Sequence, residues 1–259
     1  MAPLSDKFYT ARIVERRDLS ADLWIIRVAP GGEFRYQPGQ YATLGVIDPQ
    51  KHHERAYSIV SAPHEELLEF FIELVPEGEL TPLLYPLQVG GEMTSRKVAK
   101  GRFTLDTTSG RTNHLLLATV TGIAPFVSYV RSLHRRSKEG SFSGEHKLFL
   151  VQGASRSWEF GYREEMERIA AEAPWLTYVP TISRPWEDAA WKGETGRVDD
   201  LIRKYTDSWG LTPDNTSAYL CGHPSMIENG KGILQRRGWK KETMKEEVYF
   251  IPAKDAAAS

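Results

Sequence analysis

The spacing of hydrophobic residues along the chain changes character near residue 110. Before this point, apolar and β-branched residues recur at strand-like spacing in short stretches, separated by turns such as Pro30-Gly31-Gly32. The predicted strands cover residues 9–15, 21–28, 40–46, 55–60, 68–75, 92–98 and 101–105. Six or seven short strands with regular turns predict a small antiparallel β-barrel.

After Ser109-Gly110-Arg111 the pattern becomes one of alternating strands and helices. Residues 115–119 and 147–151 are continuous apolar runs, typical of strands that are buried on both faces. Helices are predicted at residues 125–137, 159–172, 198–205 and 225–237, and further strands near 176–182 and 218–220. The alternation predicts a parallel sheet with helices on both sides. We therefore divide the chain into a barrel domain (residues 1–108) and an α/β domain (residues 109–259).

Composition narrows the class of protein. Hydrophobic residues make up 41% of the 259 residues, and Lys plus Arg (33) nearly balance Asp plus Glu (34), so no field of one sign favours nucleic acid or a membrane surface. The first residues lack the apolar core of a signal peptide and no run approaches a membrane span, which predicts a cytoplasmic protein. The single cysteine, Cys221, excludes an internal disulfide, a four-thiolate zinc site and a self-contained iron-sulfur cluster. A redox protein of this composition needs an organic cofactor.

The stretch Arg55-Ala-Tyr-Ser58 combines a cation, an aromatic ring and a hydroxyl on one predicted strand. Arg55 and Tyr57 share a face of that strand. Downstream, Gly78-Glu-Leu-Thr81 precedes a short helical pattern, whose backbone N–H groups could bind a pyrophosphate that Arg55 also neutralises. Taken alone, an edge strand with ordinary surface residues explains the first stretch better.

A second candidate site follows the predicted strand near residue 180. Ser183 and Arg184 place a hydroxyl and a guanidinium at the carboxyl edge of the parallel sheet, where ligands bind in such folds. An arginine suits the 2′-phosphate of NADP, whereas NAD sites more often carry an acid there. The pattern favours NADP over NAD, with an exposed Arg on a surface turn as the alternative.

Four motifs occur in a recognisable order, and together they extend over nearly the whole chain. They are Arg55-Ala-Tyr-Ser58, Gly78-Glu-Leu-Thr81, Thr121-Gly-Ile-Ala-Pro-Phe126 and Tyr219-Leu-Cys-Gly-His-Pro-Ser-Met226. By these motifs the chain resembles the ferredoxin-NADP(+) reductase family. The resemblance implies an N-terminal FAD-binding barrel, a C-terminal NADP-binding domain and a flavin in the cleft between them.

The resemblance also implies the cofactor-binding residues. For FAD these are Arg55, Ala56, Tyr57, Ser58, Gly78, Glu79, Leu80 and Thr81, with Tyr57 against the isoalloxazine ring and Ser58 near its nitrogen N5. For NADP(H) they are Thr121, Gly122, Arg156, Ser183, Arg184, Arg197 and Met226. Arg156 stands one place later than the arginine that relatives often carry.

Further implied residues lie near the reacting atoms. Cys221 ends a strand beside the nicotinamide, where it packs and positions and is not a nucleophile. Glu247 resembles a carboxylate near the active site of some relatives. Tyr249, with Phe250 as second choice, is expected to cover the flavin and to move aside for NADP(H). Ser58, Cys221, Glu247 and Tyr249 are thus the expected catalytic set. The alternative for the aromatics is a terminal strand that packs them into the core.

Val120 departs from the family pattern, because relatives commonly have Gly-Thr-Gly where this chain has Val-Thr-Gly. A β-branched residue rarely adopts a positive φ. We therefore expect Val120 to be extended, as the last strand residue or a turn residue, and Gly122 to supply the close backbone approach.

The expected activity is exchange of electrons between NADP(H), as hydride, and ferredoxin or flavodoxin through FAD. Basic clusters are candidate docking patches for an acidic carrier, although such clusters are usually just solvated surface; they comprise Arg131, Arg135, Arg136 and Lys138, and Arg236, Arg237, Lys240, Lys241 and Lys245. Three alternatives remain: a reductase that serves an oxygenase or free flavin, a non-catalytic relay subunit, and a scaffold that has lost FAD.

Overall fold

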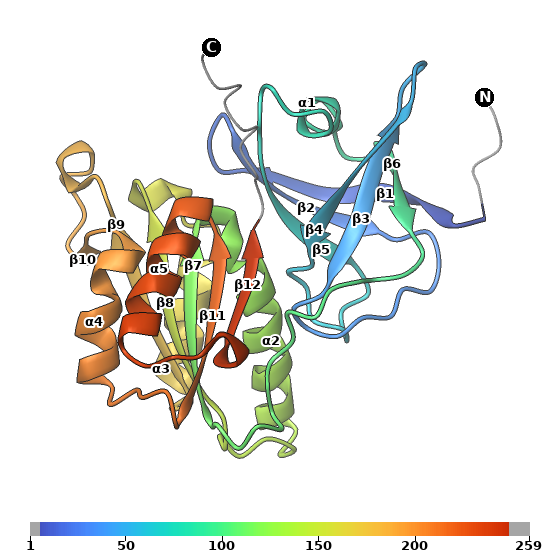
Figure 1. Ribbon diagram of the computed structural model, residues 1–259. Helices are drawn as coiled ribbons and strands as arrows, with labels where there is room; N and C mark the ends of the chain where they lie inside the picture. Colours follow the sequence, from blue (N-terminus) through green and yellow to red (C-terminus); the bar gives the residue numbers. More distant parts are fainter. Residues whose placement is uncertain (1–5, 249–259) are drawn as a thin grey trace, which may run out of the picture.

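The computed structural model describes residues 6–248 and contains two six-stranded sheets that lie side by side (Figure 1). In the first sheet all neighbouring strands are antiparallel, in the order β4-β3-β6-β1-β2-β5. Its strands are β1 (Phe8–Asp18), β2 (Leu23–Ala29), β3 (Tyr41–Ile47), β4 (His52–Ser58), β5 (Leu68–Glu73) and β6 (Glu92–Arg96), and the short helix α1 (Thr81–Leu84) lies between β5 and β6. The predicted antiparallel architecture is confirmed.

The first sheet curls so that its two edges approach each other. Just after β4, the backbone N–H of Val60 donates to the carbonyl of Glu69 on β5 at 2.9 Å. Inside the curl, Trp24, Ile26 and Phe70 are almost completely buried and form the centre of the barrel core. The barrel therefore has an apolar core of its own.

The predicted strand at residues 101–105 is wrong. Residues 101–105 form no strand, and the preceding Lys100 makes an isolated bridge with Tyr41. Phe103 is buried against the second domain instead, and its carbonyl accepts a hydrogen bond from the hydroxyl of Tyr129. The apolar residues in this stretch reflect packing between domains, which has no strand periodicity.

The second sheet is parallel throughout, in the order β10-β9-β8-β7-β11-β12. Its strands are β7 (Asn113–Thr119), β8 (Lys147–Ala154), β9 (Leu176–Ile182), β10 (Glu194–Thr195), β11 (Thr216–Gly222) and β12 (Met244–Val248). The helices are α2 (Ala124–Lys138), α3 (Arg163–Glu172), α4 (Val198–Ser208) and α5 (Pro224–Arg236), with the 3₁₀ turns η1 (Val120–Ile123), η2 (Ser157–Glu159), η3 (Pro185–Glu187) and η4 (Lys241–Thr243).

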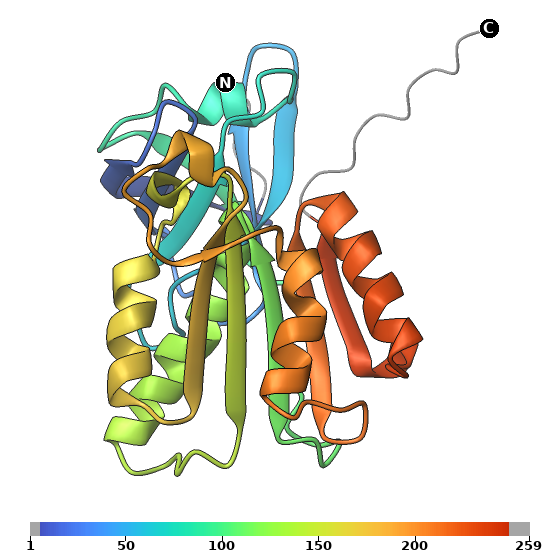
Figure 2. The same ribbon diagram turned by 90° about the vertical axis from the view of Figure 1, so that its left-hand side faces the viewer.

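Alternate residues of β7 explain why helices cover both faces of this sheet (Figure 2). Leu116 and Ala118 belong to one buried cluster with residues of α2 and α3, and Leu115 and Leu117 belong to another with residues of α4 and α5. A strand such as β7, with apolar residues at the four successive positions 115–118, requires cover on both of its faces. The helices predicted from the sequence are all present, although α3 begins at Arg163 because residues 157–159 form η2.

The two domains share a continuous apolar interface. The cluster that contains α2 also includes Leu23, Phe71 and Phe103 of the barrel, and Phe103 packs edge-on against Tyr219 of β11 with ring centroids 5.7 Å apart. β6 ends at Arg96 and β7 begins at Asn113, so the proposed division at residue 108 falls in the connection between them.

Candidate active site

A hydrogen bond between the domains links the end of β4 to the last described strand. The hydroxyl of Ser58 donates to Oε2 of Glu247 on β12 at 2.7 Å, and Ser58 is 5% exposed. Burial raises the pKa of Glu247 to about 6, although the Ser58 hydrogen bond opposes this shift. Two residues that are 189 positions apart in the chain therefore bring a buried hydroxyl and a partly buried, titratable carboxyl together where the domains meet.

Cys221 lies beside this pair at the end of β11. It is completely buried and stands in register between Ala118 of β7 and Glu247 of β12. Gly122 packs so closely against it that a Cβ at position 122 would overlap the carbonyl oxygen of Cys221. The η1 turn can therefore approach β11 only with glycine at this position.

The expectation of an extended Val120 is wrong. Val120 has φ +43° and begins η1, immediately after the extended Thr119. The positions on either side are fixed: Gly122 lies against Cys221, and the hydroxyl of Thr119 accepts the N–H of His223 at 2.8 Å. Val120 also packs against two apolar clusters. These contacts hold a β-branched residue in a conformation that normally favours glycine.

Two cations of the barrel, Arg55 and Lys51, meet at Glu79, one of the residues expected to bind FAD. Oε2 of Glu79 accepts a hydrogen bond from Arg55 at 2.7 Å, and Oε1 accepts one from Lys51 at 2.8 Å. The two cations thus converge on one anion, and a pyrophosphate presents the same chemistry to them. Lys51 was missed from the sequence, because it lies in the turn just before β4 and outside the Arg55-Ala-Tyr-Ser58 stretch.

Other predicted FAD residues take different places around this cluster. Tyr57 is partly buried against the barrel core, while Ala56 on the same strand is exposed. The hydroxyl of Thr81 accepts the N–H of Val75 at 2.9 Å and donates to its carbonyl at 3.1 Å. Leu80 is 1% exposed, so it can face a cofactor only through its backbone. Gly78 closes the preceding turn by donating to the carbonyl of Val75.

A cavity of about 760 Å³ opens at the carboxyl ends of β7, β8, β9 and β11. Its volume lies within the usual range for small-molecule sites. Six of the predicted NADP(H) residues line it: Thr121, Arg156, Ser183, Arg184, Arg197 and Met226. The seventh, Gly122, does not line the cavity. Its contact is with the backbone of Cys221, and it allows the η1 turn to approach β11.

The three arginines of this cavity differ in how far their charge is already neutralised. Arg156 is bound by Glu159 at 3.1 Å and by Glu187 at 2.6 Å. Arg184 is about half exposed and approaches Glu187 only at 3.6 Å. Arg197 is also about half exposed and contacts Asp199 at 3.3 Å. Arg184 and Arg197 are therefore the better placed to meet a phosphate.

Ser225 is a further polar group of this cavity that the sequence reasoning missed as a ligand. Its hydroxyl lies 3.4 Å from the guanidinium of Arg197 and 2.8 Å from Nδ1 of His223. Ser225 stands in the first turn of α5, where backbone N–H groups favour an anion. The signal was present in the sequence, because Ser225 lies within the fourth motif.

Tyr249 and Phe250 lie outside the described residues. Arg131 does not belong to a docking patch, because its side chain is only 17% exposed and pairs with Glu65, Glu69 and Glu165. The long side chain folds back into the domain interface, which the helical pattern of charges does not reveal.

Residues 6–248 contain no group of three His, Cys, Asp or Glu side chains that is arranged to hold a metal ion. Within the same range, no helix is both long and apolar enough to cross a bilayer.

Comparison with known proteins gives two domain matches and relatives that align over most of this chain. Residues 10–105 match the oxidoreductase FAD-binding domain and residues 116–231 match the oxidoreductase NAD-binding domain. A ferredoxin-NADP reductase of Azotobacter vinelandii is 30% identical over 244 residues, covering 88% of this chain and 90% of the relative. The phenol hydroxylase P5 protein of Acinetobacter pittii is 27% identical and covers 96% of this chain, which spans 67% of that relative.

The fold is also similar to a solved structure. The ferredoxin NADP+ reductase of Neisseria gonorrhoeae with bound FAD and NADP superposes with a TM-score of 0.82, covering 95% of this chain and all of that one. The two sequences are 22% identical, so this likeness bears on the fold alone. The sequence relatives and the fold agree on a two-domain flavoprotein.

Proposed function

The chain belongs to the ferredoxin-NADP reductase family, and on that premise we propose that it exchanges electrons between NADP(H) and a one-electron carrier such as ferredoxin or flavodoxin. It is an FAD-dependent oxidoreductase with an FAD-binding domain and a nucleotide-binding domain. The observation that carries the proposal is the contact between Ser58 and Glu247. It joins the barrel to the α/β domain beside the strand end that carries Cys221.

FAD, when bound, supplies the redox chemistry, because a flavin takes up two electrons together and releases them singly. The residues of the chain bind the FAD and the nucleotide, orient them and exclude water from the site. In the proposal Arg55 and Lys51, which now bind Glu79, would hold the pyrophosphate, and Tyr57 would lie against the ring system. Ser58 would donate a hydrogen bond to the flavin, and Glu247 would give or accept the separate proton that balances the charge when the flavin is reduced or oxidised. Tyr249 is proposed to cover the flavin at rest.

The preference for NADP over NAD is proposed to rest on Arg184 and Arg197. Both guanidinium groups are about half exposed and line the cavity at the carboxyl edge of the sheet. A dianionic 2′-phosphate gains charge-assisted hydrogen bonds from such groups, and a ribose hydroxyl gains much less. Arg156 is proposed to contribute only after it leaves Glu159 or Glu187.

A second candidate is supply of electrons to an oxygenase. The similarity to the phenol hydroxylase P5 protein favours it, because that relative also aligns over nearly the whole of this chain. In both candidates the chain takes electrons from NADP(H) through FAD, and the two differ in the acceptor that receives them.

Stopped-flow reduction tests the proposal. The purified protein is expected to be yellow, and NADPH is expected to reduce its flavin at least about tenfold faster than NADH at the same subsaturating concentration. The reduced protein is then mixed with a ferredoxin, a flavodoxin or an oxygenase component. Equal rates with NADPH and NADH would overturn the roles of Arg184 and Arg197, and a protein that binds no flavin would overturn the proposal as a whole.

A further inference from the structure

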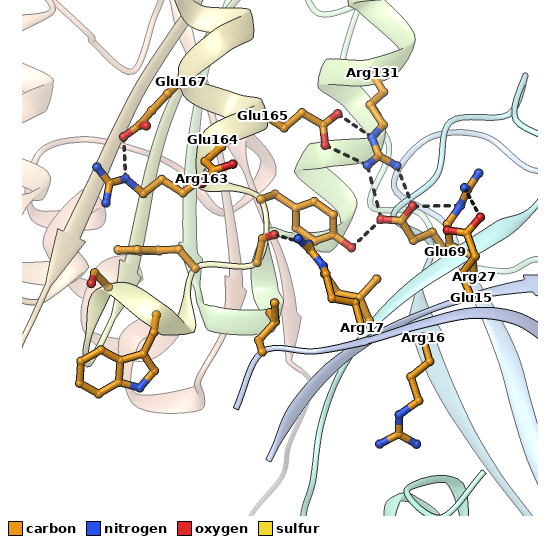
Figure 3. Close-up of a pocket in the computed structure, with 17 residues that line it drawn as sticks. Glu15, Arg16, Arg17, Arg27, Glu69, Arg131, Arg163, Glu164, Glu165 and Glu167 are labelled. Carbon is orange, nitrogen blue, oxygen red and sulfur yellow. Dashed lines mark hydrogen bonds and ion pairs between the residues drawn. The ribbon is translucent and has the colours of Figure 1, made fainter. Parts of the chain in front are cut away.

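A second cavity, of about 780 Å³, lies at the interface of the two domains (Figure 3). Barrel residues of β1, β2 and β5 form one side of it, and residues of α2, η2 and α3 form the other. Figure 3 shows that Glu165, Arg131, Glu69 and Arg27 follow one another across this interface. We call Arg27, Glu69, Arg131, Tyr162 and Glu165 the interdomain charge cluster.

Glu69 is the barrel's contribution at the centre of this cluster. It lies on β5 and is only 6% exposed. Its Oε1 accepts the hydroxyl of Tyr162 at 2.7 Å and a hydrogen bond from Arg131 at 3.4 Å, and its Oε2 accepts another from Arg131 at 3.3 Å. Arg27, on the neighbouring strand β2, approaches Oε2 at 3.6 Å. A buried carboxylate of one domain is thus neutralised mainly by side chains of the other.

Arg131 is the counterpart in the α/β domain. Its Nε and Nη2 donate to the two carboxylate oxygens of Glu165 on α3, at 2.8 and 2.9 Å. This two-point contact fixes the plane of the guanidinium. The remaining edge of the group faces Glu69 and, at 3.5 Å, Glu65 of the barrel. The guanidinium is therefore oriented by its own domain and presented to the barrel.

The apolar part of the interface does not have this directional character. Phe71 and Tyr162 meet edge to face with ring centroids 5.7 Å apart, within a cluster of buried apolar residues from both domains. Apolar contact is non-directional and tolerates small rotations of one surface on the other. Buried charges that are hydrogen-bonded do not tolerate such rotations, because each broken hydrogen bond leaves a buried polar group without a partner.

Both ends of the cluster are connected to the proposed reaction site by rigid elements. Arg131 lies in the middle of α2, which continues directly from η1 with Thr121. Glu69 lies on β5, and Glu73 at the end of the same strand lines the nucleotide cavity. A rotation about the cluster would thus shift η1 against the barrel at the cleft.

We propose that the interdomain charge cluster fixes the angle between the two domains and thereby aligns the nicotinamide with the flavin, with Arg131 and Glu69 as positioning residues. The inference rests on the proposed function, because it presumes that hydride passes between these two groups. Misplacement by about 1 Å costs on the order of a hundredfold in rate. The cluster therefore acts on the chemical step, and the nucleotide keeps its own contacts in the α/β domain.

The test compares the holoenzyme with the variants Arg131→Met and Glu69→Gln. Arg135→Met is the matched control, since Arg135 lies one turn further along α2 in an exposed pair with Glu139. NADPH affinity and the rate of flavin reduction are measured separately. Both test variants are expected to reduce flavin at least about tenfold more slowly, with the NADPH dissociation constant changed less than about twofold. The control is expected to match the wild type.

A distance measurement gives a second readout that needs no turnover. Spin labels at Val89→Cys in the barrel and Glu242→Cys in the α/β domain occupy exposed positions, and the native Cys221 is completely buried. The distribution of distances between the labels is expected to broaden or shift in Arg131→Met and to stay narrow in Arg135→Met. The conservative Arg131→Lys keeps the charge without the two-point contact and is expected to be intermediate.

The outcomes separate the two claims. Failure of the wild type to be reduced by NADPH would contradict the proposed function. A normal wild type, with wild-type rates and distances in both test variants, would overturn the positioning role. A slow variant with unchanged distances and weakened NADPH binding would also overturn it. If Arg131→Met does not fold, the nearly isosteric Glu69→Gln decides.

Discussion

At the scale of single residues, Val120 combines a strained backbone with a packed side chain. A non-glycine residue in the left-handed region costs about 1–2 kcal/mol, and Val120 has φ +43°. Replacement by glycine removes this strain. It also loses the apolar contacts of the side chain and raises the backbone entropy of the unfolded chain, and these two effects lower the free energy of unfolding by about 1 kcal/mol. We predict that Val120→Gly changes the free energy of unfolding by less than about 1 kcal/mol and leaves NADP(H) binding unchanged or tighter.

Val120→Ala is the matched comparison, because alanine keeps much of the strain and loses the packing. It is expected to lower the free energy of unfolding by about 1 kcal/mol. Urea denaturation and titration with NADP+ measure both variants. A marked loss of NADP+ affinity in Val120→Gly would show that the valine side chain packs against the nucleotide.

Glu247 makes stability depend on pH with a defined sign. Its pKa is raised from 4.5 to about 6, mainly by burial, so between these values the folded protein binds the proton more tightly than the unfolded chain. This contribution to stability is therefore present below about pH 4.5 and is lost as the pH rises to about 6. Glu247→Gln removes the titration and retains an acceptor for Ser58.

We predict that Glu247→Gln gains about 1 kcal/mol over the wild type between pH 4.5 and pH 7, after an allowance for partial exposure. Urea denaturation across this range measures the difference. Glu246→Gln is the control, as it changes an exposed neighbour on β12 that pairs with Lys231. A constant difference between Glu247→Gln and the wild type at all pH values would contradict the assignment.

At the scale of elements, the close approach of η1 to β11 depends on the absence of a side chain at Gly122. We predict that Gly122→Ala lowers the free energy of unfolding by about 2–3 kcal/mol or displaces η1, since a methyl group there overlaps backbone. Gly232→Ala is the control within α5, where the nearest atom is the mobile tip of Arg236 at 3.4 Å. It is expected to stabilise by about 0.5–1 kcal/mol. Thermal unfolding distinguishes the two, and equal stabilities would refute the tight η1 contact.

Elements with a strong local period were predictable from the sequence. β7 is apolar at successive positions because both of its faces carry helices, and α2 was predicted to within a residue at each end. Residues whose surroundings come from distant parts of the chain were not. Phe103 is apolar because it packs on Tyr219, and Val120 is left-handed because Gly122 and Thr119 are fixed by β11 and His223.

In the candidate site, too, some residues could be predicted from the local sequence and others could not. Ser183 and Arg184 line the nucleotide cavity, as expected from their place just after β9. The burial of Arg131 was not foreseeable, because its three carboxylate partners come from positions 65, 69 and 165. A helix with four basic residues appears solvated when only its own sequence is considered.

At the scale of the whole molecule, the apolar interface and the interdomain charge cluster have separate consequences. The interface joins both domains in one buried cluster, which includes Ile25 and Phe71 of the barrel and Phe126 and Tyr129 of α2. If one domain unfolded alone, the apolar surface that the other domain buries against it would be exposed to water. This costs free energy, so we expect the two domains to unfold together. The apolar interface holds the two domains together, and the interdomain charge cluster is proposed to fix the angle between them.

We therefore predict that the holoenzyme unfolds in one cooperative transition. Helical circular dichroism reports mainly on the α/β domain, which holds α2 to α5, and flavin fluorescence reports on release of FAD from the barrel. In urea with excess FAD the two signals are expected to have the same midpoint. Arg131→Met should lower that midpoint and keep the signals coincident, because the apolar interface still couples the domains while their angle is free to vary. Two separate transitions in the wild type would contradict this coupling, and separation in Arg131→Met alone would assign the coupling to the charges instead.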